Sequence, residues 1–260
     1  MAEYPGSILR VEYPSDQPLA VVTLDAPPLN VVTIPTREHF AAVFRELEEN
    51  ESVRVVIVRG SGDEAFSSGG DIGAFLKATP EYLSHLAQNV AAPECCSKPV
   101  IARLSGYALG VGLEIALACD FRIASETTQI GLPEMRLGMI PGSGGTQRVA
   151  RMAGLGRAMD MILRTRRLSA EEARSWGLLT EVVPVNELDA RVNALVDELL
   201  AVSPLAFKVG KEALHASMEV PLSAGLALEG RMYGFLRTTE DFQEGVQAFK
   251  EKRRPRFQGK

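Results

Sequence analysis

Two glutamates in segments otherwise poor in charge are the residues best suited to acid–base chemistry. Glu114 is the sole charge in the apolar segment 111–119, which has the pattern of a buried helix. Burying a carboxylate is costly, and a raised pKa or a hydrogen-bond network usually compensates. Glu114 could instead have a structural role, because it lies in the first turn of the expected helix, where the dipole favours a negative charge.

The second glutamate, Glu134, follows Pro133 in the glycine-rich segment 131–145. Its position also fits the first turn of a helix, with proline at the first helical position and an acid at the second. Two carboxylates offered to one pocket can divide acid and base roles when their pKa values are separated. A catalytic site with two glutamates is therefore one hypothesis, and two separate helix starts are the other.

Two loops with little side-chain bulk could supply backbone donors to such a site. They cover residues 67–71 and 108–112, and the second opens the helix that carries Glu114. Exposed N–H groups at such places can hold a developing oxyanion. Each loop could also be only a tight turn, but together they make a two-donor oxyanion hole a reasonable expectation.

The elements that must position these residues alternate between strands and helices in the first half of the chain. Strands are expected at 8–13, 19–24, 53–58, 99–104 and 121–124, and helices at 36–50 and 111–119. Residues 59–70 and 105–110 are expected as loops. This alternation predicts an α/β architecture with helices on the faces of a sheet.

From Thr146 onward the pattern is helical. Ser203 is a candidate N-cap before Pro204, and helices are expected near 204–217, 222–237 and 240–251. We therefore expect two domains. Residues 1–200 would form the catalytic core, and residues 201–260 a helical subdomain used for oligomerisation.

Composition argues against several other classes of protein. With 28 Lys and Arg against 33 Asp and Glu, the net charge is −5, which disfavours nucleic acid as a partner. No apolar run approaches the roughly 18–20 residues that span a membrane, so no membrane association is expected. With no visible signal peptide, a cytoplasmic location is expected. The three cysteines and three histidines show no metal-ligand spacing, so no metal is expected.

Nucleotide and serine-hydrolase motifs are incomplete. The glycine-rich turns beginning at 60, 110 and 142 lack the third small residue of a dinucleotide fingerprint, or the helix that should follow it. No Walker A sequence is present. Ser143 has a proline where the hydrolase elbow requires glycine, so serine nucleophile chemistry lacks its local signature.

Four segments in order resemble the enoyl-CoA hydratase/isomerase (crotonase) family. They are 65–72, 106–120, 132–148 and 168–178, and the similarity extends over roughly residues 8–257. The resemblance implies a crotonase-like spiral of ββα units with a C-terminal α-helical trimerisation region, assembled as a homotrimer or homohexamer. It implies an acyl-CoA thioester as substrate and no separate cofactor, because CoA is part of the substrate.

The resemblance also implies roles for individual residues. The thioester carbonyl would accept hydrogen bonds from the backbone N–H groups of Gly70 and Val111, where many members have alanine and glycine. Residues implied to bind substrate or CoA are Ala65, Ser68, Asp71, Ile72, Gly73, Gly142, Phe249 and Lys252. Many members have lysine in place of Gly73. For Lys252 a solvated basic tail is the alternative, although residues 250–260 carry a net charge of +5 that would suit a phosphate.

The activity implied by both glutamates together is that of an enoyl-CoA hydratase, a lyase of fatty acid metabolism. Glu114 would activate water for attack at C3, and Glu134 would deliver a proton to C2. The alternatives are a hydratase of cyclic or dienoyl-CoA, or an enoyl-CoA double-bond isomerase. RNA binding, known in one branch of the family, is disfavoured because Arg37 and Arg45 lie among acidic residues on their helix.

Overall fold

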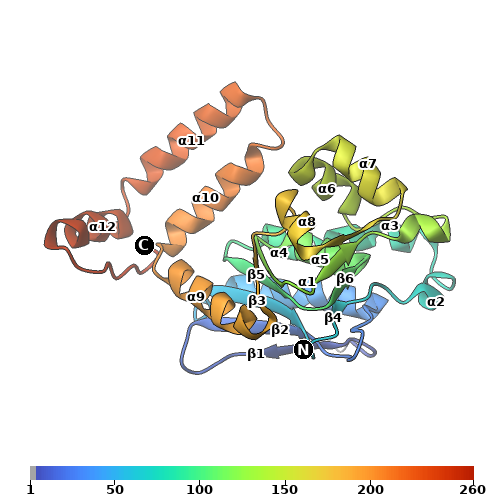
Figure 1. Ribbon diagram of the computed structural model, residues 1–260. Helices are drawn as coiled ribbons and strands as arrows, with labels where there is room; N and C mark the ends of the chain where they lie inside the picture. Colours follow the sequence, from blue (N-terminus) through green and yellow to red (C-terminus); the bar gives the residue numbers. More distant parts are fainter. Residues whose placement is uncertain (1–3) are drawn as a thin grey trace. The chain divides into compact units, whose positions relative to one another are not determined.

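Six strands form the larger of two sheets in the computed structural model, which describes residues 4–260 (Figure 1). In spatial order they are β1 (Leu9–Glu12), β2 (Leu19–Leu24), β3 (Val55–Gly60), β5 (Val100–Leu104), β7 (Phe121–Ser125) and β10 (Glu181–Val183). β1 is antiparallel to β2, and every other pair is parallel. The central strands are nearly continuous apolar runs because both faces are covered.

The smaller sheet has four strands of three residues each. Its order is β4 (Ala65–Ser67), β6 (Tyr107–Leu109), β8 (Gln129–Gly131) and β9 (Arg167–Ser169). The first three strands are parallel, and β9 is antiparallel to β8.

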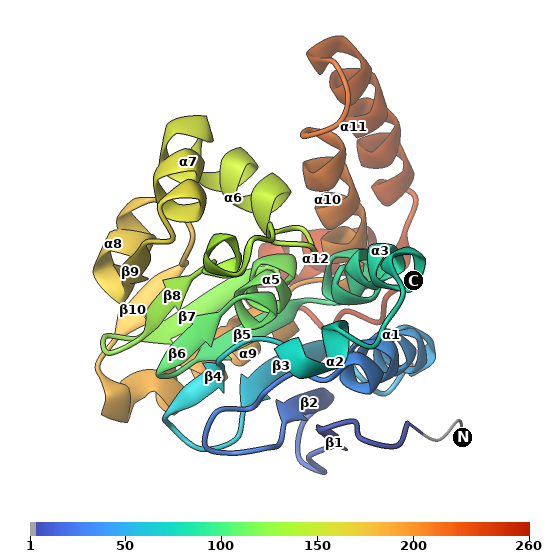
Figure 2. The same cartoon turned by 90° about the vertical axis from the view of Figure 1, so that its right-hand side faces the viewer.

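The chain contributes alternately to the two sheets as it winds into a spiral. Each turn gives a strand to the larger sheet, a strand to the smaller sheet, and then helical structure, as in β5, β6 and α5 (Val111–Ala118). Figure 2 shows β4, β6 and β8 following the same order as β3, β5 and β7. The spiral of ββα units implied by the family resemblance is confirmed.

Helices cover the sheets and carry the loops of the cavity described below. In the first part of the chain they are α1 (Ile34–Glu49), α2 (Ile72–Phe75), α3 (Pro80–Val90), α4 (Ala92–Cys95), α5, the 3₁₀ helix η1 (Glu134–Leu137), α6 (Gly145–Ala153), α7 (Leu155–Leu163), α8 (Ala170–Ser175) and the 3₁₀ helix η2 (Val185–Glu187). All eight residues of α5 are buried. The apolar core is shared by α5, the stripe of α1 that contains Phe40 and Phe44, and the inner face of the larger sheet.

The C-terminal end of α5 is capped by a buried cation. Arg122 donates hydrogen bonds to the carbonyls of Cys119, at 2.5 Å, and Leu178, at 2.7 Å. Helix C-terminal carbonyls have no intrahelical donors, so the guanidinium satisfies groups that burial would otherwise leave unpaired. This contact fixes the helix that carries Glu114.

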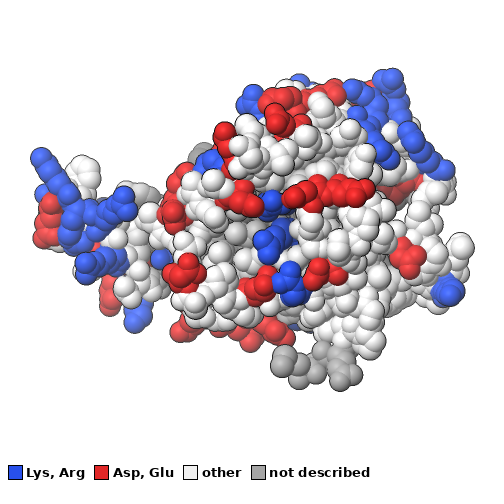
Figure 3. All heavy atoms as spheres, turned by 60° about the horizontal axis from the view of Figure 1, so that its bottom comes forward, with Lys and Arg blue, Asp and Glu red and all other residues white. Residues whose placement is uncertain are grey.

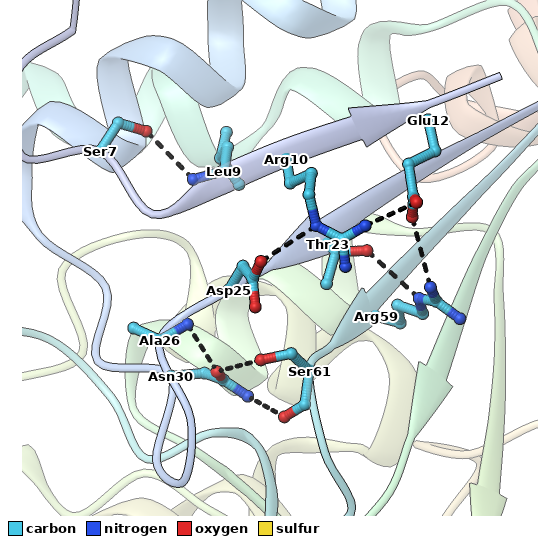
Figure 4. Close-up of polar contacts among 10 residues, drawn as sticks. All are labelled: Ser7, Leu9, Arg10, Glu12, Thr23, Asp25, Ala26, Asn30, Arg59 and Ser61. Carbon is cyan, nitrogen blue, oxygen red and sulfur yellow. Dashed lines mark hydrogen bonds and ion pairs between the residues drawn. The ribbon is translucent and has the colours of Figure 1, made fainter.

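Ion pairs and hydrogen bonds join the edge of the larger sheet (Figure 4). Arg10 on β1 pairs with Asp25 at 3.0 Å, and Arg59 on β3 reaches both Thr23 of β2 and Glu12 of β1. Basic and acidic side chains alternate over the middle of the face shown in Figure 3. This part of the surface therefore offers no continuous basic area.

The chain divides into two compact units. The first ends at Val192 and lacks Ser97–Pro99; the second holds Ser97–Pro99 and Asn193–Lys260. The division falls within α9 (Leu188–Leu200), so the roles predicted for residues 1–200 and 201–260 stay predictions. Among residues 4–260 no helix is both long and apolar enough to cross a membrane.

The second unit contains the antiparallel helices α10 (Pro204–Ala216) and α11 (Leu222–Leu236), followed by α12 (Glu240–Glu251) (Figure 1). Ser203 caps α10 as predicted, because its hydroxyl accepts from the Ala206 N–H at 3.1 Å. Asp241 is buried and joins three segments, accepting from Ser203 Oγ at 2.6 Å and from the backbone of Gln258 at 2.7 Å. The C-terminal tail is thus bound to the start of α10 and α12.

The predicted elements of the larger sheet and the long helices are confirmed within two residues at each end. Three predictions are wrong. Loops 59–70 and 105–110 contain β4 and β6, and the region after Thr146, predicted as helical only, contains β9 and β10. These strands have three residues each, too few for a period to be visible, and they form because neighbouring strands pair with them.

Candidate active site

A cavity of about 150 Å³ lies in the first unit where the loop after β4, the start of α5 and η1 meet. It brings together seven of the predicted site residues: Ser68, Gly70, Ile72, Val111, Glu114, Glu134 and Gly142. The sequence segments that supply them lie up to 74 positions apart, and the ββα spiral places them around one space.

The backbone around Gly70 is held by the segment Leu29–Val32. Ser68 N–H donates to the Leu29 carbonyl at 2.8 Å, Val32 N–H donates to the Gly69 carbonyl at 2.9 Å, and Asp71 N–H donates to the Val32 carbonyl at 3.1 Å. In this parallel bridge the hydrogen bonds are made by the residues on either side of Gly70. The N–H of Gly70 therefore takes no part in the bridge. It is available to an acceptor in the cavity.

The side chain of Asn30 holds the same segment through hydrogen bonds to neighbouring loops (Figure 4). Its side chain is fully buried; Nδ2 donates to the carbonyls of Ser61, at 3.0 Å, and Ala65, at 2.7 Å, and Oδ1 accepts from Ala26 N–H at 3.0 Å. A buried amide with these partners costs little, whereas its loss would leave several backbone groups unsatisfied. Asn30 therefore joins the loop before α1 to β4 and supports the position of Gly70.

Val111 is the first residue of α5, so its N–H has no intrahelical acceptor. The preceding Gly110 has φ of 53° and ψ of −130°, a conformation that glycine adopts readily. A Cβ atom at Gly110 would lie 3.1 Å from Glu134 Oε1 and 3.6 Å from the Cα of Gly69. The absence of a side chain here lets both donor loops approach Glu134.

Glu114 is 2% exposed and is bound by backbone. Its Oε1 accepts from the N–H groups of Ser143, at 2.7 Å, and Gly145, at 2.9 Å. Burial raises the pKa of Glu114, while these two hydrogen bonds and the charges of Arg37 and Arg148 act in the opposite direction. The carboxylate has one fixed oxygen and a second one free to bind other groups in the cavity.

Glu134 has a looser environment. It is the first residue of η1, with Pro133 as the residue before it, so the predicted second helical position is off by one. Its Oε2 is buried and has no hydrogen-bond partner among residues 4–260. Burial raises the pKa of Glu134 to about 7, and the charge of Glu114 adds to this effect while Arg37 opposes it. At neutral pH this carboxyl can both give and take a proton.

Arg37 and Ser143 also line the cavity and were not among the predicted site residues. Arg37 lies on the buried stripe of α1 with Phe40, Phe44 and Leu47. The spacing 37, 40, 44, 47 is that of one helix face, so a cation on this apolar stripe was the signal. Ser143 had no comparable signal, because its role depends on a loop conformation.

The rest of the cavity wall is apolar, as expected for a site that holds a hydrocarbon group. The side chains concerned are Ile72, Phe75, Leu83, Leu86, Leu137, Met139 and Ile140. They come from α2, α3, η1 and the loop that follows η1. Among residues 4–260 no group of three or more His, Cys, Asp or Glu side chains could hold a metal ion.

Five of the predicted binding residues do not line this cavity. Ala65 is fully buried in β4, Asp71 caps α2 by accepting from the N–H groups of Gly73, at 3.0 Å, and Ala74, at 3.3 Å, and Gly73 is part of this cap. Phe249 and Lys252 belong to the second unit. Phe249 is 85% exposed, and Lys252 is the C-cap residue that follows α12. Their predicted roles in CoA binding stay predictions.

Comparison with known proteins supports the reading of the fold. A family profile described as enoyl-CoA hydratase/isomerase matches residues 15–260. The short-chain-enoyl-CoA hydratase of Clostridium acetobutylicum is 36% identical over 241 residues, 91% of this chain and 92% of that protein. The human mitochondrial enoyl-CoA hydratase domain-containing protein 2 is 39% identical over 230 residues, 83% of this chain and 76% of that protein.

Solved structures of enoyl-CoA hydratases have the same fold. The crystal structure of an enoyl-CoA hydratase from Bacillus anthracis matches with a TM-score of 0.91 at 36% identity, covering 98% of this chain and 100% of that chain. The crotonase-like α/β fold predicted from the sequence is thereby confirmed. The chain belongs to the enoyl-CoA hydratase/isomerase family.

Proposed function

We propose that this protein is an enoyl-CoA hydratase that adds water reversibly across the 2,3 double bond of an enoyl-CoA thioester. The observation that carries the proposal is the pair Glu114 and Glu134, which line one cavity beside the N–H groups of Gly70 and Val111. Two carboxylates with different surroundings can serve as base and acid in one reaction.

In the proposed reaction the thioester carbonyl accepts hydrogen bonds from Gly70 and Val111. Negative charge that develops on this oxygen as C3 is attacked would be stabilised there. Glu114, ionised, takes a proton from water while the oxygen of that water bonds to C3. Glu134, protonated, gives its proton to C2. The product is a 3-hydroxyacyl-CoA, and proton exchange with solvent restores both carboxyls.

The assignment of the base to Glu114 follows from its hydrogen bonds. Two backbone N–H groups favour its ionised form, whereas one oxygen of Glu134 has no such donor. Glu134, with a pKa raised to about 7, is partly protonated at neutral pH, and the protonated form can deliver its proton to C2. The apolar wall from Ile72 to Ile140 would hold the acyl chain, and fatty acid metabolism in the cytoplasm is the proposed setting.

The assembly we propose is a homotrimer or homohexamer formed through the second unit. None of the fifteen residues of α11, all of them described, is buried in the single chain, and Leu222, Leu226 and Tyr233 are each more than half exposed. A helix with this much exposed apolar surface is expected to have a partner. Phe249 and Lys252 are proposed to contact CoA, across a subunit boundary in such an assembly.

Two alternative activities remain within the same family: hydration of cyclic or dienoyl-CoA substrates, and double-bond isomerisation. The cavity wall contains flexible Leu and Met side chains whose packing does not favour one acyl shape. An isomerase would move a proton between two carbons without adding water, so its product keeps the double bond.

The test is a panel of linear, branched and cyclic enoyl-CoA substrates, followed by the loss of absorbance of the conjugated thioester. Crotonyl-CoA should be hydrated, and Glu114→Gln and Glu134→Gln should each lower kcat by about 10²–10⁴-fold because each removes an acid or base. Circular dichroism should show both variants folded. Near wild-type turnover in both variants would refute the proposed mechanism, and a product that retains its double bond would support the isomerase.

A further inference from the structure

The cavity contains one cation whose role the proposed reaction does not use. Arg37 is 7% exposed, its guanidinium carbon lies 5.3 Å from the centre of the Phe75 ring, and it lines the same cavity as the two glutamates. Its Nη1 donates to Ser143 Oγ at 3.1 Å, and its Nε has no hydrogen-bond partner among residues 4–260. Burying an arginine this far is costly unless its charge is compensated.

The compensation comes from the two carboxyl groups. Ser143, which accepts from Arg37, donates its own N–H to Glu114 Oε1 at 2.7 Å, so one residue bridges the cation and the proposed base. The positive charge of Arg37 acts on Glu114 and on Glu134 alike, whereas Arg148, which donates to the Ser143 carbonyl at 3.1 Å and pairs with Glu94, acts on Glu114. Arg37 is therefore coupled to Glu114 through a hydrogen-bond path and to Glu134 through charge.

Space for this guanidinium depends on the residue that provides the oxyanion donor. A Cβ atom at Gly70 would lie 3.1 Å from Arg37 Nη2 and 3.0 Å from Phe75 Cζ. Both distances are tighter than ordinary contacts between side-chain atoms, so alanine at this position would press on the guanidinium and on the ring it faces. Gly70 and Arg37 are thus sterically linked.

Two roles fit a buried cation here. Arg37 could bind an anionic acyl group, or it could offset the two glutamates. Its Nη1 already donates to Ser143, whose N–H binds Glu114, so the guanidinium is tied to the glutamate pair. The observations favour the second role, in which the acyl group is uncharged.

We propose that Arg37 is a positioning residue that offsets the charge of the glutamate pair from within the cavity and holds Glu114 in place through Ser143, and that glycine at position 70 makes room for it. The inference rests on the proposed function. Arg37 acts through its charge and through Ser143, without contact with the reacting atoms.

The expected effect of removing Arg37 follows from its sign. A nearby positive charge favours the ionised form of a carboxyl, so without it the pKa of both glutamates rises. In Arg37→Met the pH at which hydration kcat/KM falls should therefore move upward by about one pH unit, which corresponds to about a tenfold change in the proton affinity of Glu134. Arg37→Lys keeps the charge and should restore most of the wild-type pH profile.

The matched control is Arg45→Met, which removes an exposed arginine from the same helix and should leave the profile unchanged. Gly70→Ala should move the profile in the same direction as Arg37→Met, and should add little when combined with it, because the two changes affect one contact. Wild-type turnover and an unshifted profile in Arg37→Met would overturn the inference while leaving the hydratase proposal intact.

A second measurement separates the inference from the proposed function. Carboxyl carbons of ¹³C-labelled glutamate can be titrated by NMR, with the Glu134 signal assigned by its absence in Glu134→Gln. An upward shift of that titration in folded Arg37→Met, reversed in Arg37→Lys, supports the inference even if no enoyl-CoA is hydrated. An unchanged Glu134 titration in Arg37→Met refutes the inference. If Arg37→Met fails to fold, the Glu134 titration in Arg37→Lys and in Gly70→Ala still tests it.

Discussion

Glu114 and Glu134 have the same side chain in one cavity, but their surroundings differ. Glu114 projects from a fully buried helix, and two backbone N–H groups bind its Oε1 at 2.7 and 2.9 Å. Glu134 projects from a 3₁₀ turn, and its Oε2 has no partner among residues 4–260. One carboxyl is held in place by two donors that oppose the effect of burial on its pKa, and the other has an oxygen without a donor and a pKa raised to about 7.

This difference originates in the backbone rather than in the glutamates themselves. The donors to Glu114 come from a loop in which Gly145 allows a close approach: a Cβ there would lie 2.9 Å from Pro141 and 3.1 Å from Glu114 Oε1. Glu134 instead borders Gly110, which leaves its carboxyl room; its own backbone N–H acts on the carboxyl, and Oε2 has no donor among residues 4–260. The surroundings of the two glutamates therefore differ because of two glycines: Gly145 allows hydrogen bonds to Glu114, and Gly110 leaves space beside Glu134.

The largest effect on this comparison is expected from Gly110→Ala. The new Cβ would meet Glu134 Oε1 at 3.1 Å and would require a φ of 53° that alanine rarely adopts, so Glu134 and the Val111 donor should both move. A misplacement of about 1 Å can lower kcat by about 10²-fold. Steady-state kinetics with crotonyl-CoA measure this loss.

The control is Gly156→Ala in α7, where the added Cβ meets nothing within 4 Å, and its turnover should equal that of the wild type. A double-mutant cycle shows whether Gly110→Ala acts through Glu134: in the Glu134→Gln background it should cost less than in the wild type. Equal losses of kcat in both backgrounds would show that Gly110→Ala acts only by displacing the Val111 donor.

Much of this arrangement could be predicted from residue types. A lone glutamate in an apolar helix and a glutamate in a glycine-rich turn made Glu114 and Glu134 candidates, because buried charge is rare unless it has a partner or a function, but the family resemblance was needed to assign them roles. The low side-chain bulk of residues 67–71 and 108–112 indicated the backbone donors. Long elements such as β2 and α12 have enough residues for their period to be visible.

The remainder depends on contacts between distant segments. The smaller sheet has strands of three residues, which no local pattern identifies, and the Leu29–Val32 segment holds Gly70 through backbone hydrogen bonds between distant parts of the chain. In the sequence Arg37 was considered only together with the acidic residues of its helix, as an argument against RNA binding. Its place on the Phe40 stripe becomes decisive only once that face is known to be buried.

The second prediction concerns the pH dependence of turnover. The pKa of Glu134 is raised to about 7, and in hydration Glu134 must be protonated to deliver a proton to C2. Hydration kcat/KM should therefore fall as pH rises through about 7, by up to tenfold per pH unit, whereas dehydration, which needs ionised Glu134, should rise over the same range. Rates measured from pH 5.5 to 9 in both directions test this.

Glu134→Gln should remove this inflection from the residual activity, because glutamine does not titrate. An inflection that persists unchanged in the variant would assign it to another group, with Glu114 the first candidate. Profiles that fall with pH in both directions would contradict the division of roles between the two glutamates.

The smallest effect concerns stability. The pKa of Glu134 is about 7 in the folded protein against an ordinary 4.5, so between these values the folded state keeps a proton that the unfolded chain has released. The free energy of unfolding attributable to this group therefore falls as pH rises from 4.5 to 7. Glu134→Gln has no such loss, so its stability relative to the wild type should increase from pH 5 to pH 8.

Urea unfolding at both pH values, at one protomer concentration, measures the change, because assembly would otherwise alter the apparent stability. Glu49→Gln removes an exposed carboxyl from α1 and should show the same difference from the wild type at both pH values. If Glu134→Gln behaves like Glu49→Gln, then Glu134 is ionised over the whole range. In that case Glu134 could not be the proton donor to C2, and the contrast between a fixed base and a titrating acid would have to be abandoned.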